Sequence, residues 1–208
     1  MSGLKPHEIE VRSMAIIDAL LPAGDWTPSE RAVVKRLVHT SGDPSLATAV
    51  RFQRDAVEAG VTALRAGASV FTDTQMARIG VNAGRVGDLG GAVECLIADD
   101  AVSAEAARAG RTRAACAMRT FGPRLEGAVV AIGNAPTALR EVLALAAEGV
   151  ARPALVIGVP VGFVDAAESK DALMASDLAF IAIEGTRGGS PLAAAAVNAL
   201  LRVLTGEA

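Results

Sequence analysis

The chain has 208 residues, of which 51% are apolar, and its 20 basic and 23 acidic side chains leave a net charge of −3. This length fits one large domain and is enough to bury a sizeable core. The balanced charge and an aromatic content of only 3% argue against a nucleic-acid partner, which selects for a basic face with stacking aromatics.

The N-terminus and the cysteines bear on location. Residues 1–13 carry acidic side chains and lack the apolar core of a secretory signal. The longest uncharged run, residues 188–201, is too short to cross a bilayer. Cys95 and Cys116 have no metal-like spacing, and two free thiols suit a reducing cytosol. We therefore expect a cytoplasmic protein with no membrane segment and no bound metal.

The first two predicted elements are amphipathic helices. Residues 7–21 repeat apolar side chains near helical spacing. The second helix covers residues 29–39, with Thr27 as its N-cap, Pro28 in the first turn and Glu30 three positions after the cap.

From residue 48 onward, strand-like and helical patterns alternate. The strand-like runs are short and continuously apolar, and they cover residues 48–52, 69–72, 92–97, 128–132, 154–158 and 178–183. The helical patterns cover residues 55–66, 74–79, 104–120, 137–147, 168–175 and 191–204, and a glycine-rich loop covers 80–91. Continuous apolar strands separated by helices predict a mainly parallel sheet with helices on both faces. The fold class is therefore α/β, in a single domain over residues 1–208.

Glycines and polar residues follow four of the predicted strands, in residues 71–73, 132–136, 158–163 and 184–190. In parallel sheets, ligands bind at the carboxyl ends of the strands. Four such segments at one edge predict a broad cleft.

The segment GTRGGS, Gly185 to Ser190, resembles a phosphate-binding loop. It lacks the Lys-Ser/Thr pair of that motif, because Ser190 is followed by Pro191. Its backbone N–H groups precede a predicted helix and suit any anion, including a carboxylate. A plain strand-to-helix turn explains the same residues.

Other polar residues at strand ends and helix starts have two interpretations. Asp73 follows an apolar strand and has either a capping or a site role. Asn134 either caps the next helix or aims its amide at a ligand. The cluster of Glu168, Lys170 and Asp171 is explained by a solvated helix start.

His39 lies in RLVHTSGD, residues 36–43, and is one of two histidines in the chain. A histidine near a helix C-terminus is favoured by the helix dipole alone. No Ser-His-Asp or Cys-His pattern surrounds it, and no second ligand lies at metal spacing, so nucleophilic or zinc chemistry has no support. The remaining chemistry is general acid–base catalysis, because the pKa of a histidine lies near neutrality.

Taken together and in this order, the segments resemble the precorrin-8X methylmutase family, which includes the cobalt-precorrin-8 methylmutases. The resemblance runs from about residue 9 to residue 201. It is carried by RSMAII (12–17), RLVHTSGD (36–43), TDTQM (72–76), TRAACAM (112–118), VVAIGNAPTAL (129–139), VIGVPVGFVDAAESKDAL (156–173) and GTRGGS (185–190).

This resemblance implies an isomerase of cobalamin (vitamin B12) biosynthesis. Such an enzyme moves a methyl group of the tetrapyrrole from C-11 to C-12, so that precorrin-8X becomes hydrogenobyrinic acid, or cobalt-precorrin-8 becomes cobyrinic acid. It also implies a homodimer with sites near the subunit interface, and no cofactor.

The resemblance further implies site residues. The family's catalytic histidine corresponds to His39, as proton donor or acceptor, and its Arg-Ser and Thr-Arg pairs fall on Arg12-Ser13 and Thr112-Arg113. Arginines and backbone donors would hold the acetate and propionate groups of the substrate. The expected substrate-binding residues are Arg12, Ser13, Asp73, Arg85, Thr112, Arg113, Asn134, Arg187, Gly188, Gly189 and Ser190.

The chain also departs from the family pattern. Many members have Thr-Arg-x-Arg where this chain has residues 82–85, so that only Arg85 persists. Glu184 and Thr186 stand where many members have arginines, and Arg187 follows one position later. These departures keep open a tetrapyrrole carrier without catalysis. A nucleotide-binding module built on GTRGGS is the third hypothesis.

Overall fold

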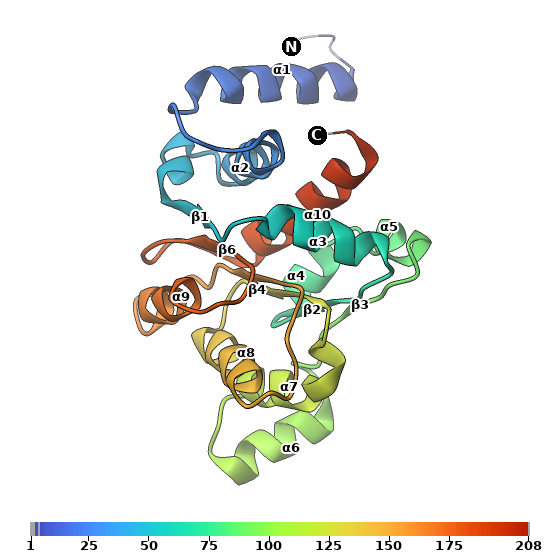
Figure 1. Cartoon of the computed structure of the whole chain (residues 1–208), viewed down its shortest axis with the longest axis vertical. Helices are drawn as coiled ribbons and strands as arrows, with labels where there is room; N and C mark the ends of the chain where they lie inside the picture. Colours follow the sequence, from blue (N-terminus) through green and yellow to red (C-terminus); the bar gives the residue numbers. More distant parts are fainter. Residues whose placement is uncertain (1–2, 4, 208) are drawn as a thin grey trace.

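Figure 1 shows the computed structural model of the chain, which describes Gly3 and residues 5–207. The ends of the predicted domain at residues 1, 2, 4 and 208 lie outside the described residues. The strands are β1 (Val50–Phe52), β2 (Val70–Thr72), β3 (Val93–Glu94), β4 (Val129–Ile132), β5 (Leu155–Gly158) and β6 (Phe180–Ile183). The helices are α1 (Pro6–Leu20), α2 (Pro28–Ser41), α3 (Ala56–Arg65), α4 (Gln75–Gly80), α5 (Ala83–Asp88), α6 (Asp100–Ala109), α7 (Arg113–Phe121), α8 (Pro136–Ala147), α9 (Ala166–Met174) and α10 (Ser190–Thr205).

The sheet has the strand order β1-β6-β5-β4-β2-β3. Strands β2 to β6 pair in parallel, and β1 pairs with β6 in the antiparallel direction, with Val50 opposite Ile183. The predicted α/β class and the mainly parallel sheet are confirmed. The reversed strand lies at an edge, where it has one neighbour.

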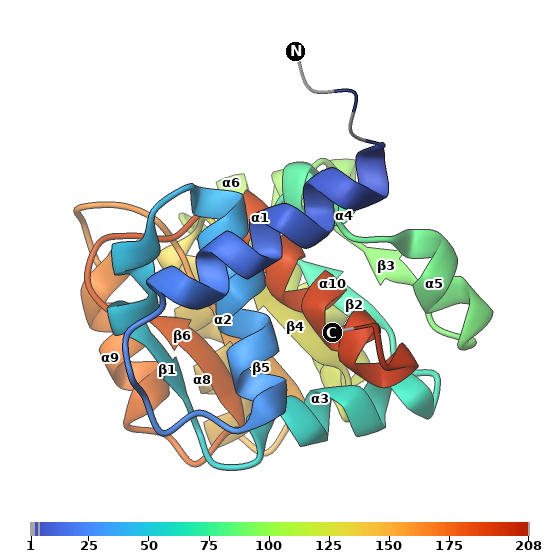
Figure 2. The same ribbon diagram turned by 90° about the horizontal axis from the view of Figure 1, so that it is seen from above.

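Helices cover both faces of the sheet (Figures 1 and 2). Helices α2, α3 and α10 pack on one face, and α7, α8 and α9 pack on the other. Helix α1 lies outside α2 and crosses above α10, as the view from above shows. The last residues of α10 therefore end close to α1.

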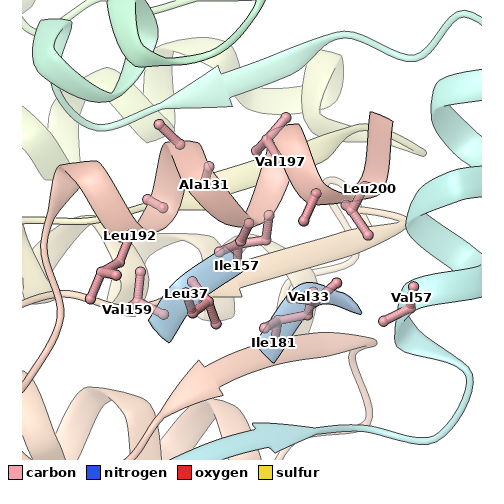
Figure 3. Packing of buried hydrophobic residues seen from close by; sticks show 14 of the residues in the cluster. Val33, Leu37, Val57, Ala131, Ile157, Val159, Ile181, Leu192, Val197 and Leu200 are labelled. Atoms are coloured by element: carbon pink, nitrogen blue, oxygen red, sulfur yellow. The ribbon is translucent and has the colours of Figure 1, made fainter. Parts of the chain in front are cut away.

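The core is built from small and branched aliphatic side chains, as the composition predicts. Successive residues of each central strand point to opposite faces, so Ile157 joins one cluster and Val156 the other. Figure 3 shows the first cluster, in which Leu192 and Leu200 of α10 and Leu37 of α2 pack around Ile157. The helices that carry the site therefore rest on a rigid sheet.

The glycine-rich segment 80–91 is not only a loop, and that prediction is wrong. Helix α5 forms inside it, because the Asn82 side chain caps the helix by accepting the Arg85 N–H at 3.1 Å. The capping signal was present in the sequence, but the glycines around it favoured a loop.

The single helix predicted over residues 104–120 is also wrong, because two helices, α6 and α7, occupy this segment. Gly110 ends α6 with φ = 61°, in the left-handed region, and Thr112 caps α7 by accepting the Ala115 N–H at 3.2 Å. All six predicted strand runs were longer than the observed strands, three of them by at least two residues. Residues 48 and 49 belong to a 3₁₀ segment, Pro44–Ala49, the run 92–97 keeps only β3, and the run 178–183 keeps only β6.

Candidate functional site

His39 lies in the last turn of α2 and faces solvent. Helix α2 continues two residues beyond its predicted end and stops at Gly42, which has φ = 68°. Ser13 of α1 lies opposite the imidazole, with its Oγ 3.1 Å from Nδ1 of His39. The histidine is therefore held from a second helix while its other nitrogen, Nε2, stays available.

The serine contact defines what Nε2 can do. If the hydroxyl donates to Nδ1, the neutral ring carries its proton on Nε2 and can donate a hydrogen bond there; if the hydroxyl accepts from Nδ1–H, Nε2 is a base. In the second arrangement Nε2 can take up a proton and, as the imidazolium, return it, while Nδ1–H stays bonded to the serine oxygen.

An ion-pair cluster lies next to His39 and joins three helices. Glu10 of α1 binds Arg36 of α2 at 2.7 Å and Arg202 of α10 at 3.0 Å. The hydrogen bond from Arg36 holds the pKa of Glu10 below its ordinary value, against the opposing effect of burial. Arg36 and Arg202 are absent from the predicted site. Arg36 could have been found, because it precedes His39 by three residues and so shares its helix face.

A groove of about 380 Å³ runs beside the histidine. It is lined by Arg36, His39, Thr40, Gly80, Pro191, Ala194, Ala195, Asn198 and Arg202. A larger groove, of about 970 Å³ between α1, α2 and α10, shares Arg36 and Arg202 with it. Together they form a long concave surface whose floor is α10, with His39 beside it.

Arg85 lies at the other end of this surface. A small pocket shares Asn198 and Arg202 with the His39 groove and includes Arg85. Arg85 pairs with Glu207 at 2.8 Å. Asn198 donates to the carbonyl of Gly80 at 2.8 Å and accepts from the N–H of Asn82 at 2.9 Å, which ties the start of α5 to α10.

The loop at residues 184–190 reaches the His39 side of the sheet edge through Arg187. Its guanidinium binds Asp43 at 2.9 Å, four residues after His39, and the Ser45 hydroxyl at 3.1 Å. Hydrogen bonds from Ser45, with the nearby Arg187 charge, lower the pKa of Asp43. The Gly189 N–H donates to the Val159 carbonyl at 2.9 Å. One backbone donor of the supposed phosphate loop is therefore already used.

Two glycines allow the carboxyl-edge loops to touch. A Cβ on Gly188 would collide with the carbonyl of Val159, and a Cβ on Gly133 would lie 2.6 Å from the Cα of Ser190. The Ser190 hydroxyl lies 2.8 Å from that of Thr74, the N-cap of α4. Gly188, Gly189 and Ser190 thus pack within the meeting point of the loops after β2, β4, β5 and β6.

Asp73 has a structural place in this meeting point. The residue is fully buried, and its carboxylate accepts the N–H groups of Gly133 at 3.0 Å, Asn134 at 2.8 Å and Ala135 at 2.7 Å. Burial raises its pKa, and the three donors oppose that rise. Of the two interpretations of Asp73, the capping role is the one its contacts match. The cap position of α8 is Ala135, which leaves the exposed Asn134 side chain at the edge.

Thr112 and Arg113 lie apart from the His39 groove. Thr112 caps α7 on the other face of the sheet, and its hydroxyl lies 2.7 Å from that of Thr137 near the start of α8. Arg113 and Arg12 are exposed, and within the described part of the chain neither forms an ion pair or a side-chain hydrogen bond. Within a single chain, therefore, the predicted pairs Arg12-Ser13 and Thr112-Arg113 lie apart.

Glu184, at the position where the family resemblance implies an arginine, has a defined partner. Arg51 of β1 binds its carboxylate with two nitrogens, at 3.0 Å and 2.6 Å. This pair ties the edge strand β1 to the start of the 184–190 loop. Glu184 therefore has a structural role of its own in this chain, as the partner of Arg51.

Among residues 3 and 5–207, no group of three or more His, Cys, Asp or Glu side chains is placed to hold a metal ion. None of the helices in the described residues has the length and apolar character needed to span a bilayer.

Comparisons with known proteins agree on one family. The sequence model of precorrin-8X methylmutase matches residues 8–203. A cobalt-precorrin-8 methylmutase of Priestia megaterium is 42% identical over 95% of this chain and 88% of its own length. A precorrin-8X methylmutase of a Sinorhizobium species is 41% identical over 94% of both chains. The solved precorrin-8X methyl mutase of Thermus thermophilus superposes with a TM-score of 0.87 at 40% identity, over 95% of this chain and 98% of that one.

The α/β fold carries a long groove with a solvent-facing histidine beside it, an arrangement that suits an enzyme using acid–base chemistry. The chain belongs to the precorrin-8X methylmutase family, and it is an isomerase of cobalamin biosynthesis. The resemblance and the function predicted from the sequence are confirmed.

Proposed function

We propose that this chain moves the C-11 methyl group of precorrin-8X, or of cobalt-precorrin-8, to C-12, with His39 as the proton donor and acceptor. The observation that carries this proposal is the contact of His39 Nδ1 with Ser13, which orients the ring and leaves Nε2 free beside the groove. A methyl shift within one molecule needs no hydride carrier or nucleophile. It needs the macrocycle in the protonation state that lowers the barrier, and one histidine can set that state.

Arginines supply the cationic contacts for the substrate's carboxylates. In the groove these are Arg36, Arg202 and Arg85, which are now paired with Glu10 and Glu207. A carboxylate of the substrate can replace a protein carboxylate on an arginine without leaving either charge buried and unpaired.

Arg12 and Arg113 are better suited than Arg36, Arg202 and Arg85 to bind the carboxylates of a substrate that arrives from solvent. Both are exposed and have no ion-pair partner among the described residues. We propose both as carboxylate ligands, together with Asn134 and Arg187 at the sheet edge.

We further propose that the protein works as a homodimer in the cytoplasm. Helix α1 exposes Ile9, Ile16 and Leu20, each by more than half. At 100° per residue these three fall on one side of the helix, close to Ser13. Such a stripe beside the site is typical of a surface that a second copy covers. This supports the expected location of the site near a subunit interface.

The carrier hypothesis is not favoured by the family comparisons, and the nucleotide hypothesis has little structural support. The 184–190 loop lacks the Lys-Ser/Thr pair of a phosphate-binding loop, and the Gly189 N–H donates to the Val159 carbonyl. That N–H is therefore not free to cradle a phosphate.

The deciding experiment mixes the protein with precorrin-8X, and separately with cobalt-precorrin-8, and follows the absorption spectrum over time. The methyl shift alters the conjugated system, so turnover changes the spectrum. Conversion of one substrate supports the proposal and names the metal-free or the cobalt route. A binding shift without conversion of either substrate would contradict the catalytic proposal and favour a carrier.

A further inference from the structure

Lys170 of α9 is fully buried, although the sequence around it suggested a solvated helix start. Its neighbours Glu168 and Asp171 are exposed, as that interpretation expects. The Lys170 ammonium instead points inward and donates to the backbone carbonyl of Arg187 at 2.8 Å. The helix start is therefore solvated at its carboxylates but not at its lysine.

A buried ammonium is costly without a carboxylate beside it. Within the described residues no carboxylate forms an ion pair with Lys170, and its protein hydrogen-bond partner is the Arg187 carbonyl. Burial lowers the pKa of Lys170 from 10.5 to about 8. A methionine would fill the same space without the free-energy cost of burying a charge. What a lysine adds at this position is therefore its hydrogen bond to Arg187.

That contact lies in the loop at residues 184–190. The Lys170 ammonium donates to the backbone carbonyl of Arg187, and the Arg187 guanidinium donates to the carboxylate of Asp43. The next residue, Gly188, packs against the carbonyl of Val159 so closely that no side chain fits. Arg187 is thus fixed between α9 and the segment that follows His39.

We propose that Lys170 is a positioning residue, which fixes the backbone of Arg187 so that its guanidinium meets a carboxylate of the substrate. This inference rests on the proposed function, in which the 184–190 loop contacts the tetrapyrrole. Lys170 itself does not touch the substrate, because its side chain is covered.

The test compares Lys170→Met, which keeps the length and loses the donor, with Lys170→Gln, which keeps a donor. Arg108→Met on the distant helix α6 is the matched control, because Arg108 is exposed and, among the described residues, pairs with Glu105 alone. Each variant is assayed for kcat and KM, for thermal unfolding, and for amide hydrogen exchange and trypsin cleavage at the Arg187–Gly188 bond. The last two readouts need no substrate.

For Lys170→Met we expect KM to rise about tenfold, the effect of one charge-assisted hydrogen bond, with kcat changed less. Exchange and cleavage at residues 187–189 should be faster. The melting temperature should stay near that of the wild type, because the lost bond is offset by removal of a buried charge. Lys170→Gln should recover part of the affinity, and Arg108→Met should behave as wild type.

A double variant with Arg187→Ala tests the route of the effect. That substitution removes the guanidinium but keeps the carbonyl. If Lys170 acts by placing the guanidinium, the loss of substrate affinity from Lys170→Met should largely disappear in the Arg187→Ala background.

Amide hydrogen exchange at residues 187–189 that stays unchanged in Lys170→Met would overturn the proposal. So would a loss of activity that is fully accounted for by a lower melting temperature. If the wild type converts neither tetrapyrrole, the proposed function fails. Amide hydrogen exchange and trypsin cleavage still decide whether Lys170 holds the 184–190 loop.

Discussion

The imidazole of His39 is the residue on which the proposed chemistry depends. We expect His39→Ala to fold and to bind tetrapyrrole, but to convert it about 10²–10⁴-fold more slowly, the usual loss for a general acid or base. His39 is exposed, so its removal should leave the melting temperature nearly unchanged. Single-turnover absorption measurements check this. A fully active His39→Ala protein would show that the proton comes from elsewhere.

We expect Ser13 to act through His39, since its hydroxyl lies 3.1 Å from Nδ1. Ser13→Ala should lower kcat by about tenfold or less, because one neutral hydrogen bond contributes about 0.5–1.5 kcal/mol. In the His39→Ala background the same substitution should have no further effect on kcat. Additive losses in the double variant would mean that Ser13 contacts the substrate directly.

Lys170 also predicts a pH dependence of stability. Its pKa is about 8 in the folded protein against an ordinary value of 10.5. Between these values the unfolded chain holds a proton that the native protein has lost, so stability rises with pH. The wild type should therefore gain up to about 3 kcal/mol relative to Lys170→Met between pH 8 and 10.5. Urea unfolding of both proteins at several pH values measures the difference, and a constant difference would contradict the lowered pKa.

At the scale of elements, Asp73 joins β2 to the turn between β4 and α8. Asp73→Ala leaves three buried or half-buried N–H groups without their acceptor. We expect it to cost about 3 kcal/mol or more, and to disorder the turn that carries Asn134. Asp177→Ala is the control, because Asp177 is exposed and its surface pair with Arg152 should contribute little to stability. Equal losses in the two variants would argue against the anchoring role.

The elements also show where sequence-based prediction succeeds. Continuous apolar runs such as residues 129–132 and 155–158 predicted a parallel sheet, because both faces of these strands are buried. Strand β1 carries no such signal for its direction, since an edge strand takes its partner from the tertiary fold. The division between α6 and α7 was missed although Gly110 and Thr112 mark it, because the alanine-rich pattern around them is helical throughout.

The site was predicted less completely than the fold. His39, Ser13 and Arg187 belong to short segments that the family resemblance covers, and they lie around the groove or beside it. Arg202 gave no signal in the sequence, because it meets Glu10 of α1 only through the packing of both α10 and α1 against α2. The burial of Lys170 was not predicted for the same reason, since the loop that covers it comes from another part of the chain.

At the scale of the whole molecule, the stripe on α1 predicts how two copies associate. Ile16→Glu places a charge in the stripe and should convert a dimer into a monomer. Val11→Glu is the control, because Val11 is equally exposed, at 53%, on the opposite side of α1. Size-exclusion chromatography with light scattering distinguishes the monomer from the dimer in each variant. A wild-type monomer, or an Ile16→Glu dimer, would contradict this arrangement.

Helix α1 has only one buried side chain among those described, Ile17, and otherwise holds to the molecule through ion pairs and the Ser13 contact. A segment with so little apolar anchorage opens at a small free-energy cost, long before the sheet unfolds. The half of the site that Ser13 provides thus lies on a helix with little apolar anchorage. If a second copy covers this helix, mass action decides how often Ser13 is in place. The specific activity of the enzyme would then fall on dilution, although every chain in solution keeps its core intact.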